Sequence, residues 1–333
     1  MSDQANRLRD IIRAKNEGGL SLGSSAENSI RTPLSDLLNS QLETGSQQSR
    51  SAKVITITSG KGGVGKTNFT VNMAIAMSKL GKRVVIIDAD FGLANIEVLL
   101  GIIPKRSFAD IFSKKRSIEE ILTPGPMGIS FISGGSGFTS MASINDEHLC
   151  KIIENFEMLD SLADIVLIDT GAGIAKSVTA FVLASNETII VTTPEPTSIT
   201  DAYAIIKTAR EEMFHPLNFK LVVNRVESKD EGAEIYNRLS RVCSRFLSIE
   251  IESLGAIPYD YSLVKAVKSQ MPVALGFPES PSALAINEIC QKMLFGEANL
   301  PEPKDDGADS GSNSENSMKS FVRRLAGIFK SKA

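Results

Sequence analysis

Seven short runs of apolar residues between residues 53 and 258 place the strongest constraint on how this chain can fold. They read KVITITS, RVVIIDAD, ISFISGG, DIVLIDT, ETIIVTT, FKLVVNRV and IESLGAIP. Stretches with helical periodicity, such as TNFTVNMAIAMSKLG and SITDAYAIIKTAREEM, lie between them. Near-continuous apolar strands that alternate with helices are typical of a mostly parallel sheet with helices on both faces. The sequence therefore predicts an α/β domain over residues 53–297, with a central sheet of about seven or eight strands.

Composition narrows the class of protein further. The 333 residues carry a net charge of −3 and only three cysteines, Cys150, Cys243 and Cys290, none of them in a C-x-x-C pair. This pattern argues against a disulfide framework and against a two-cysteine metal site, and it favours a reducing compartment. No run of about 18 apolar residues and no apolar secretion segment is present. We therefore expect a cytoplasmic protein in which any basic function is local.

The segments outside the α/β domain differ from it in composition. Residues 1–15 have the spacing of a short helix, and residues 16–52, rich in Ser, Gly, Asn and Gln, are expected to form a flexible tether. Residues 298–317 form an acidic linker, and residues 318–333 are predicted to form an amphipathic helix.

The stretch SGKGGVGKT follows the first predicted strand and opens a predicted helix. It matches the phosphate-binding pattern G-x-x-x-x-G-K-[ST] through Gly60, Gly65, Lys66 and Thr67. The predicted nucleotide-binding residues are Gly60, Lys61, Gly62, Gly63, Val64, Gly65, Lys66 and Thr67. Backbone N–H groups of such a loop surround phosphate oxygens, and the helix N-terminus adds positive potential. Lys66 would contact the β- and γ-phosphates, and Thr67 would hold Mg²⁺.

Lys61 is a lysine that the general pattern does not require. It is either a solvent-exposed side chain or a second cation for the phosphates, which could reach them across a dimer interface.

Three aspartates end two of the predicted strands. Asp88 and Asp90 follow VVII, and Asp169 follows IVLI. Because ligands gather at the carboxyl ends of strands in such sheets, these side chains are expected to face the phosphates. Asp169 would hold Mg²⁺ through water, Asp88 would support the ligands around the metal, and Asp90 would position the attacking water. The alternative for each is a helix N-cap.

The stretch KGGVGKT, together with the paired aspartates, resembles the deviant Walker A ATPases of the MinD/ParA family, which belong to the SIMIBI class of P-loop NTPases. DADFGLANIEVLLG, DTGAGI and TTPEPTSITDAYAIIK are more similar to the FlhG (FleN, YlxH) regulators of flagellar number within that family. DTGAG lacks a proline common in MinD and ParA sequences, which also favours the FlhG group. The resemblance runs from residue 53 to about 295 and includes both ends of the chain.

This resemblance implies a slow regulatory ATPase that uses ATP and Mg²⁺ and forms a homodimer around its nucleotides. Lys61 would then contact the phosphates bound by the partner subunit, with Lys66 and Asp90 as the other catalytic residues. Asn224 would contact the adenine edge and the loop from Pro258 would flank the base. Without the resemblance, Asn224 is better explained as a turn residue at a strand end.

At the N-terminus, DQANRLR matches a motif of the FlhG family through Asp3, Gln4, Ala5, Leu8 and Arg9. The resemblance implies that this motif binds the signal-recognition-type GTPase FlhF and stimulates GTP hydrolysis. An amide at Gln4 could orient water and a guanidinium at Arg9 could stabilise charge. The alternative is a frayed terminus whose helical spacing is accidental.

The C-terminal segment combines apolar and basic residues on a predicted helix. Phe321, Val322, Leu325, Ile328 and Phe329 fall on one face, whereas Lys319, Arg323, Arg324, Lys330 and Lys332 supply positive charge. This pattern is typical of an interfacial helix on an anionic membrane, and a dimer would present two of them. The alternative is a helix packed on its own domain. The acidic linker argues against permanent packing, so reversible packing in the ADP-bound or empty state is also open.

The leading interpretation is an ATP-dependent switch that controls flagellar number or placement. It would bind the inner face of the cell membrane with ATP, at flagellar sites, where basal-body proteins of the C-ring are candidate partners. The alternative is a ParA/MinD-like partition or positioning ATPase that acts on DNA or another polar cargo. DNA would require a basic surface on the dimer, and a net charge of −3 makes nucleic acid the less expected partner. A metal-cluster carrier would need paired cysteines, and a related tyrosine kinase would need a tyrosine-rich tail, which residues 318–333 lack.

Overall fold

The computed structural model describes residues 51–90, 95–113, 116–135, 155–213, 215–296 and 318–331. The chain divides into two compact units, Met1–Gln48 and Ser49–Ala333, and all described residues belong to the second. The N-terminal motif of Asp3, Gln4, Ala5, Leu8 and Arg9, most of the tether, and the acidic linker lie outside the described residues.

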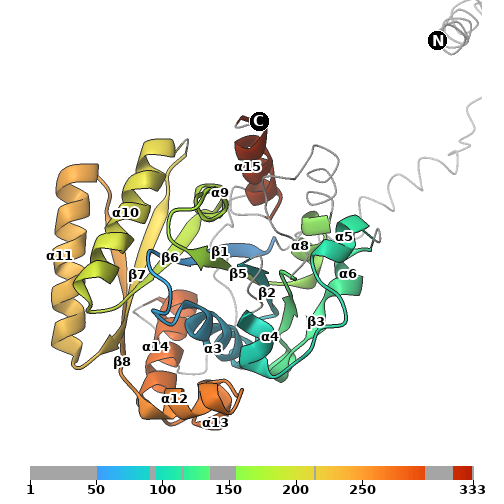
Figure 1. Cartoon of the computed structure of the whole chain (residues 1–333), viewed down its shortest axis with the longest axis horizontal. Coiled ribbons are helices and arrows are strands. Elements are labelled where there is room, and N and C mark those ends of the chain that lie inside the picture. Colours follow the sequence, from blue (N-terminus) through green and yellow to red (C-terminus); the bar gives the residue numbers. More distant parts are fainter. Residues whose placement is uncertain are drawn as a thin grey trace, which may run out of the picture. The chain divides into compact units, whose positions relative to one another are not determined.

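Within the described ranges, eight strands form one sheet (Figure 1). They are β1 (Lys53–Ser59), β2 (Val84–Ala89), β3 (Thr123–Pro124), β4 (Ser130–Ile132), β5 (Ile165–Ala172), β6 (Glu187–Thr192), β7 (Asn218–Val226) and β8 (Ile251–Pro258). Their order is β3-β4-β2-β5-β1-β6-β7-β8, and only the β3–β4 pair is antiparallel. The predicted mostly parallel sheet and its seven strand runs are confirmed. The sequence did not predict β3, because two residues are too few to show a periodicity.

Helices cover both faces of the sheet (Figure 1). One face carries α3 (Lys66–Lys79), α4 (Asn95–Leu100) and α14 (Pro281–Phe295), with α12 (Tyr261–Lys268), α13 (Val273–Gly276) and the short helix η1 (Pro126–Gly128) beside them. The other face carries α5 (Ala109–Ser113), α6 (Ile118–Ile121), α8 (Leu159–Leu162), α9 (Lys176–Ala184), α10 (Pro196–Glu212), α11 (Lys229–Leu247) and α15 (Met318–Ser331). The predicted coverage of both faces is therefore confirmed.

Each central strand contributes to two hydrophobic cores. In β1, Val54 belongs to the core under α9, whereas Ile55 and Ile57 belong to the core under α3. In β5, Ile168 faces the α9 core and Leu167 faces the α3 core. Successive strand residues point to opposite faces, so an uninterrupted apolar run is what a sheet buried on both faces requires.

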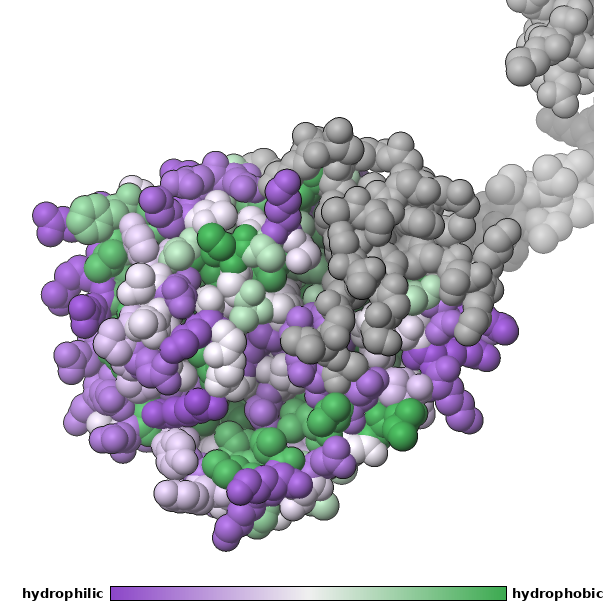
Figure 2. All heavy atoms as spheres, in the orientation of Figure 1, coloured by the Kyte–Doolittle hydropathy of each residue, from purple (hydrophilic) through white to green (hydrophobic). Residues whose placement is uncertain are grey.

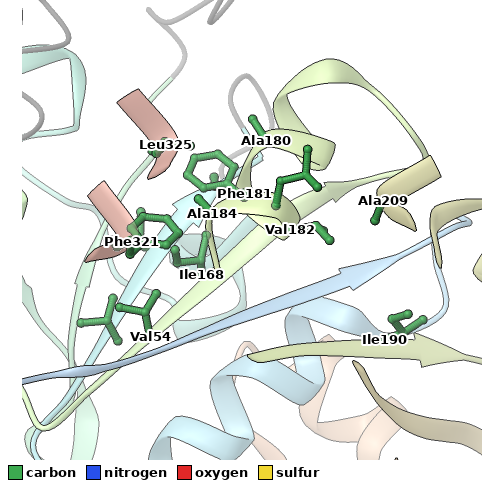
Figure 3. Close-up of a cluster of buried hydrophobic side chains, with 14 of the residues drawn as sticks. Val54, Ile168, Ala180, Phe181, Val182, Ala184, Ile190, Ala209, Phe321 and Leu325 are labelled. Atoms are coloured by element: carbon green, nitrogen blue, oxygen red, sulfur yellow. The ribbon is translucent and has the colours of Figure 1, made fainter. Parts of the chain in front are cut away.

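The C-terminal helix α15 packs on the α9 core (Figure 3). Phe321, Val322 and Leu325 are at most 1% exposed, and the ring of Phe321 stacks on that of Phe181 in α9, with 6.4 Å between centroids. Arg324 donates from Nε to the carbonyl oxygen of Ala184 at 2.7 Å, at the C-terminal end of α9. Fully burying a side chain of this size contributes about 1.5–3 kcal/mol, so these contacts favour the docked position.

The docked position is one of the arrangements that the sequence left open, and it places most of the predicted lipid-binding side chains inside the protein. Phe321, Val322, Leu325 and Ile328 are all buried, and Arg324 lies at the edge of the contact. The side chains of Phe329 and Lys330 lie outside the described residues. Lipid binding through the buried residues therefore requires α15 to leave α9.

Most of the visible surface is polar, with an apolar region at one edge. Figure 2 shows hydrophobic residues in the lower part of this face, in the region from α13 to α4 in Figure 1. Exposed apolar side chains in and beside α12 include Tyr261, Val267 and Met271. Among the described residues, none of the helices is long and apolar enough to cross a bilayer.

Candidate nucleotide-binding site

The predicted phosphate-binding loop connects β1 to α3, so the strand–loop–helix context that its mechanism requires is present. Two of its glycines are required by close contacts. A Cβ atom on Gly60 would lie 2.2 Å from the backbone carbonyl carbon of Asp201 in α10. Gly65 has a φ of 94°, and a Cβ there would lie 2.4 Å from Nδ2 of Asn224. The loop therefore tolerates no side chain at these two positions without a shift of its neighbours.

Lys66, Thr67 and Asp169 meet where β5 passes the start of α3. Nζ of Lys66 donates to Oδ1 of Asp169 at 2.9 Å, and Oγ1 of Thr67 donates to Oδ2 at 2.7 Å. Asp169 is fully buried and Lys66 is 7% exposed. A buried charge needs a partner, and here the lysine and the aspartate neutralise each other. Phosphate oxygens could replace the carboxylate as acceptors for Lys66 if a bound cation then balanced the charge of Asp169.

The same groups fit a magnesium ion that is shared with a nucleotide. Mg²⁺ is usually bound by one or two carboxylates, several waters and substrate phosphates. The hydroxyl of Thr67 and the carboxylate of Asp169 are adjacent, and both are oxygen ligands of the kind that Mg²⁺ prefers. Across the described ranges, no group of three or more His, Cys, Asp or Glu side chains could hold a metal by itself. The residues present therefore fit ATP and Mg²⁺ bound together, rather than a permanent metal centre.

Asp88 and Asp90 lie beside this cluster, at the end of β2. Asp88 is opposite Asp169 in the pairing of β2 with β5, which brings the two carboxylates together as the sequence predicted. Asp88 accepts hydrogen bonds from the backbone N–H of Asp90 at 3.1 Å and of Ile96 at 3.4 Å. Ile96 is in the first turn of α4, so Asp88 also accepts a hydrogen bond from a helix N-terminus. It lies seven residues before the start of α4, however, and is therefore not the N-cap residue that the alternative required.

The electrostatic surroundings raise the pKa values of Asp88 and Asp90. Burial, and then the charge of Asp169, raise the pKa of Asp88 to about 8, although hydrogen bonds and Lys66 oppose the shift. Burial also raises the pKa of Asp90, with a smaller contribution from Asp169, against the opposing effects of Lys66 and Asn95. Three carboxyl groups thus lie close together at this edge of the sheet. A bound cation would favour their ionised forms.

Lys61 contacts the start of α10. Its Nζ lies 2.6 Å from Oε2 of Glu195 and donates to Oγ1 of Thr197 at 3.0 Å. The hydrogen bond and charge of Lys61 lower the pKa of Glu195. The lysine side chain is 41% exposed, and exposed ion pairs of this kind are weak. Lys61 can therefore exchange Glu195 for another anion at little cost.

Asn224 and Pro258 lie at the carboxyl ends of β7 and β8. Asn224 is 3% exposed; its Nδ2 donates to the carbonyl oxygen of Val64 at 2.7 Å and its Oδ1 accepts from the N–H of Arg225 at 2.9 Å. Pro258 pairs with Val226. The structure thus places Asn224 against the phosphate-binding loop, with both ends of its amide engaged.

Four polar residues of the site were not predicted to belong to it. Thr70 donates to Oδ1 of Asp169 at 3.0 Å, and Asn95 donates to Oδ2 of Asp90 at 3.1 Å. Glu195 and Thr197 bind Lys61. The sequence contained a signal for Thr70, which follows Lys66 by one helical turn and therefore lies on the same face of α3. Glu195 and Thr197 lie in a stretch that was noted only for its similarity to a family.

The Asp88→Asn substitution is expected to reduce the pH dependence of the stability of the nucleotide-free protein. The pKa of Asp88 is about 8 in the folded chain and near 3.9 in an unfolded chain. The folded state therefore binds this proton more tightly. The resulting stabilisation is complete below about pH 4 and is lost as the pH rises to about 8. Urea midpoints of the wild type should fall across this range more steeply than those of Asp88→Asn. Asp230→Asn, on the exposed start of α11, should keep the wild-type slope, and equal slopes for Asp88→Asn and the wild type would refute the assignment.

Comparison with known proteins agrees with this geometry. Residues 55–273 match the family model described as the CobQ/CobB/MinD/ParA nucleotide binding domain. The chain is 41% identical over 242 residues to the antiactivator FleN of Pseudomonas aeruginosa, which covers 72% of this chain and 86% of FleN. It is 34% identical over 282 residues to the flagellum site-determining protein YlxH of Helicobacter pylori, which covers 82% and 89% of the two chains.

A solved structure shows the same fold. The septum site-determining protein MinD of Pyrococcus horikoshii, complexed with Mg-ADP, superposes with a TM-score of 0.59 over 73% of this chain and 96% of MinD, at 22% identity. The phosphate-binding loop, the carboxylates at the strand ends and the matches to FleN and YlxH all agree. This chain therefore belongs to the MinD/ParA family of nucleotide-binding proteins, and within it to the group that contains FleN and YlxH.

Proposed function

We propose that this protein is an ATP-hydrolysing regulator of flagellar number or placement. The contact of Lys66 and Thr67 with Asp169 carries the proposal, because it assembles the groups for binding a triphosphate and Mg²⁺ in a chain similar to FleN and YlxH. One of these relatives is named an antiactivator and the other a site-determining protein, so both names describe regulation. The output would be a change of partner and location, with slow turnover.

The residues of the site have distinct roles in this proposal. Lys66 would move from Asp169 to the β- and γ-phosphate oxygens of ATP. Thr67 and Asp169 would hold Mg²⁺, which supplies positive charge as the γ-phosphoryl group leaves. Asp90 would orient the attacking water, and the bond between the γ-phosphorus and its bridging oxygen would break to give ADP and phosphate.

Lys61 supports the proposal that the ATP-bound protein is a homodimer. Its exposed ammonium group contacts Glu195 and Thr197 of its own subunit rather than the buried cluster around Asp169. Because these surface contacts are weak, Lys61 could leave them and approach phosphates presented by a second copy. Such an added cation would stabilise the charge that develops in a loose transition state.

The helix α15 supports a nucleotide-dependent membrane location. Its buried apolar face and its exposed Arg323 have the composition of a helix that lies on anionic lipid. We infer that α15 remains on α9 in the nucleotide-free protein and is released in the ATP-bound dimer. The protein would then lie on the inner face of the cell membrane at flagellar sites, where C-ring proteins are candidate partners.

Two substitutions should separate ATP binding from hydrolysis. Lys66→Ala should abolish ATP binding, because it removes the buried cation that the phosphates require. Asp90→Ala should bind ATP as an arrested dimer and release phosphate about a hundredfold more slowly, or more, since it removes the water-positioning group. Lys207→Ala, an exposed lysine on α10, is the matched control. Nucleotide binding, phosphate release and size-exclusion chromatography measure these effects, and normal hydrolysis by Asp90→Ala would disprove its role.

Vesicle co-sedimentation tests the membrane switch directly. The full chain should pellet with anionic vesicles in ATP but not in ADP, and a chain that ends at Ser317 should stay in solution. Arg323→Ala should weaken pelleting while leaving α15 able to dock, because Arg323 is exposed in the docked helix. Arg241→Ala, an exposed arginine on α11, should pellet as the wild type does. No pelleting in either nucleotide would remove the membrane role, and salt-sensitive retention on DNA would favour the ParA-like alternative.

The N-terminal motif is proposed to stimulate the GTPase FlhF. The full chain should accelerate GTP hydrolysis by FlhF, and removal of residues 1–15 should abolish the effect. Gln4→Ala and Arg9→Ala should each reduce it, because they remove the water-orienting amide and the stabilising charge. Arg7→Ala removes the same charge at a position that is not among the matched residues of the motif, and it should stimulate normally. Equal stimulation by the chain without residues 1–15 would show that the motif has no such role.

A further inference from the structure

We infer that Asp260 is a positioning residue for the nucleotide base, which holds the loop Pro258–Tyr261 where it can flank adenine and thereby sets the preference for adenine. This inference rests on the proposed function, because it takes ATP as the ligand of the phosphate-binding loop. Asp260 is not expected to touch the nucleotide; it would act through the backbone of the loop that it anchors.

The carboxylate of Asp260 connects the N-termini of two helices. Its Oδ1 accepts a hydrogen bond from the N–H of Ser262, in the first turn of α12, at 2.7 Å. Its Oδ2 accepts from both the N–H and the Oγ of Ser282, in the first turn of α14, at 3.1 and 2.7 Å. Ser282 is completely buried. One side chain thus uses both oxygens to join the loop after β8 to the helix that covers the sheet.

The surroundings of Asp260 favour a negatively charged side chain. The N-termini of α12 and α14 both direct N–H groups that have no partner within the helix, and the positive ends of their dipoles, at the carboxylate. Burial raises the pKa of Asp260, but the hydrogen bonds from Ser282 and Ser262 outweigh it and lower the pKa overall. Hydrogen bonds to an ionised group are about twice as strong as those between neutral groups. The hydrogen bonds that hold the loop are therefore made to an ionised carboxylate, and an uncharged amide of the same size would weaken them.

The other side of the loop is attached to β7, which in turn contacts the phosphate-binding loop. The N–H of Tyr259 donates to the carbonyl oxygen of Val226 at 2.9 Å, and Pro258 pairs with the same residue. Two residues earlier on β7, Asn224 holds the carbonyl oxygen of Val64. The loop Pro258–Tyr261 is thus connected to the phosphate site through β7 and to α14 through Asp260. Its distance from bound phosphates is set by these two attachments.

The loop carries an aromatic pair that is open to a ligand. The rings of Tyr259 and Tyr261 meet edge to face, with 5.4 Å between centroids and an interplanar angle of 90°. Tyr259 is 51% exposed and Tyr261 is 72% exposed. Planar bases stack on aromatic side chains, and selection of one base requires its edge to meet fixed polar groups. Loss of the Asp260 anchor would move the loop relative to Asn224, and adenine would be less well distinguished.

The test compares nucleotides that share the phosphates but differ in the base. Equilibrium binding of ATP, GTP and inorganic tripolyphosphate to the full chain would be measured with Mg²⁺. Asp260→Asn should bind ATP about tenfold more weakly, a change of about 1.4 kcal/mol, and should lose most of its preference for ATP over GTP. Tripolyphosphate should bind as it does to the wild type, because the phosphate loop is unchanged. A merely structural role would weaken all three ligands together.

Two further variants keep the test decisive. Ser282→Ala removes one of the hydrogen bonds to Asp260 and should shift the same ratio in the same direction by less. Ser228→Ala removes the N-cap of α11, which accepts from the N–H of Glu231 at 3.2 Å, and serves as a matched loss of a helix cap away from the loop. It should leave the ATP-to-GTP ratio unchanged.

The outcomes separate the two proposals. If the wild type binds GTP or tripolyphosphate as tightly as ATP, the adenine site itself is wrong, and the proposed nucleotide must be revised. If the wild type prefers ATP and Asp260→Asn or Ser282→Ala keeps that preference unchanged, the positioning role is overturned. A parallel loss of affinity for all three ligands overturns it as well.

Discussion

The buried contact between Lys66 and Asp169 determines how the rest of the site is arranged. An isolated ammonium or carboxylate at this depth would carry a desolvation cost of several kcal/mol, so each needs the other while no nucleotide is bound. The parallel sheet supplies the geometry, because β1 and β5 are neighbours and both end at the same edge. The contact holds α3 against β5 with its phosphate-binding loop formed. Triphosphate binding would then exchange the acceptor of Lys66, while Mg²⁺ would take over the role of balancing Asp169.

The helix α9 links this cluster to the C-terminal helix. It begins at Lys176, a few residues after Asp169, and ends at Ala184, whose carbonyl oxygen accepts a hydrogen bond from Arg324. Phe181 lies between these ends and stacks on Phe321. A change at the phosphate site that moved α9 would therefore alter the surface on which α15 packs. Coupling of this kind is reciprocal, so release of α15 would favour the nucleotide state that releases it.

Sequence reasoning identified the elements well and the contacts of single side chains less well. The alternation of strand and helix patterns, and the position of the glycine-rich loop between two of them, are local properties that the chain displays directly. The pairing of Asp88 with Asp169 also followed, because strand ends in a parallel sheet share one edge. The contacts of Lys61 with Glu195, and of Asp260 with Ser282, depend on loops whose paths no periodicity encodes. For α15, the same apolar face suits lipid or α9, so the sequence could not distinguish them.

The apolar face of α15 has a composition that is compatible with two different environments. In the proposed membrane switch, Phe321 and Leu325 would be buried either against α9 or in lipid, but not in both, so the two positions would compete for the same side chains. One short amphipathic helix binds lipid weakly, and the docked contact further reduces the fraction of helix available to bind. The proposed dimer would change this balance, because two linked helices would bind with a high effective concentration. The weakness of a single helix and the strength of its docking together would make membrane residence depend on dimerisation.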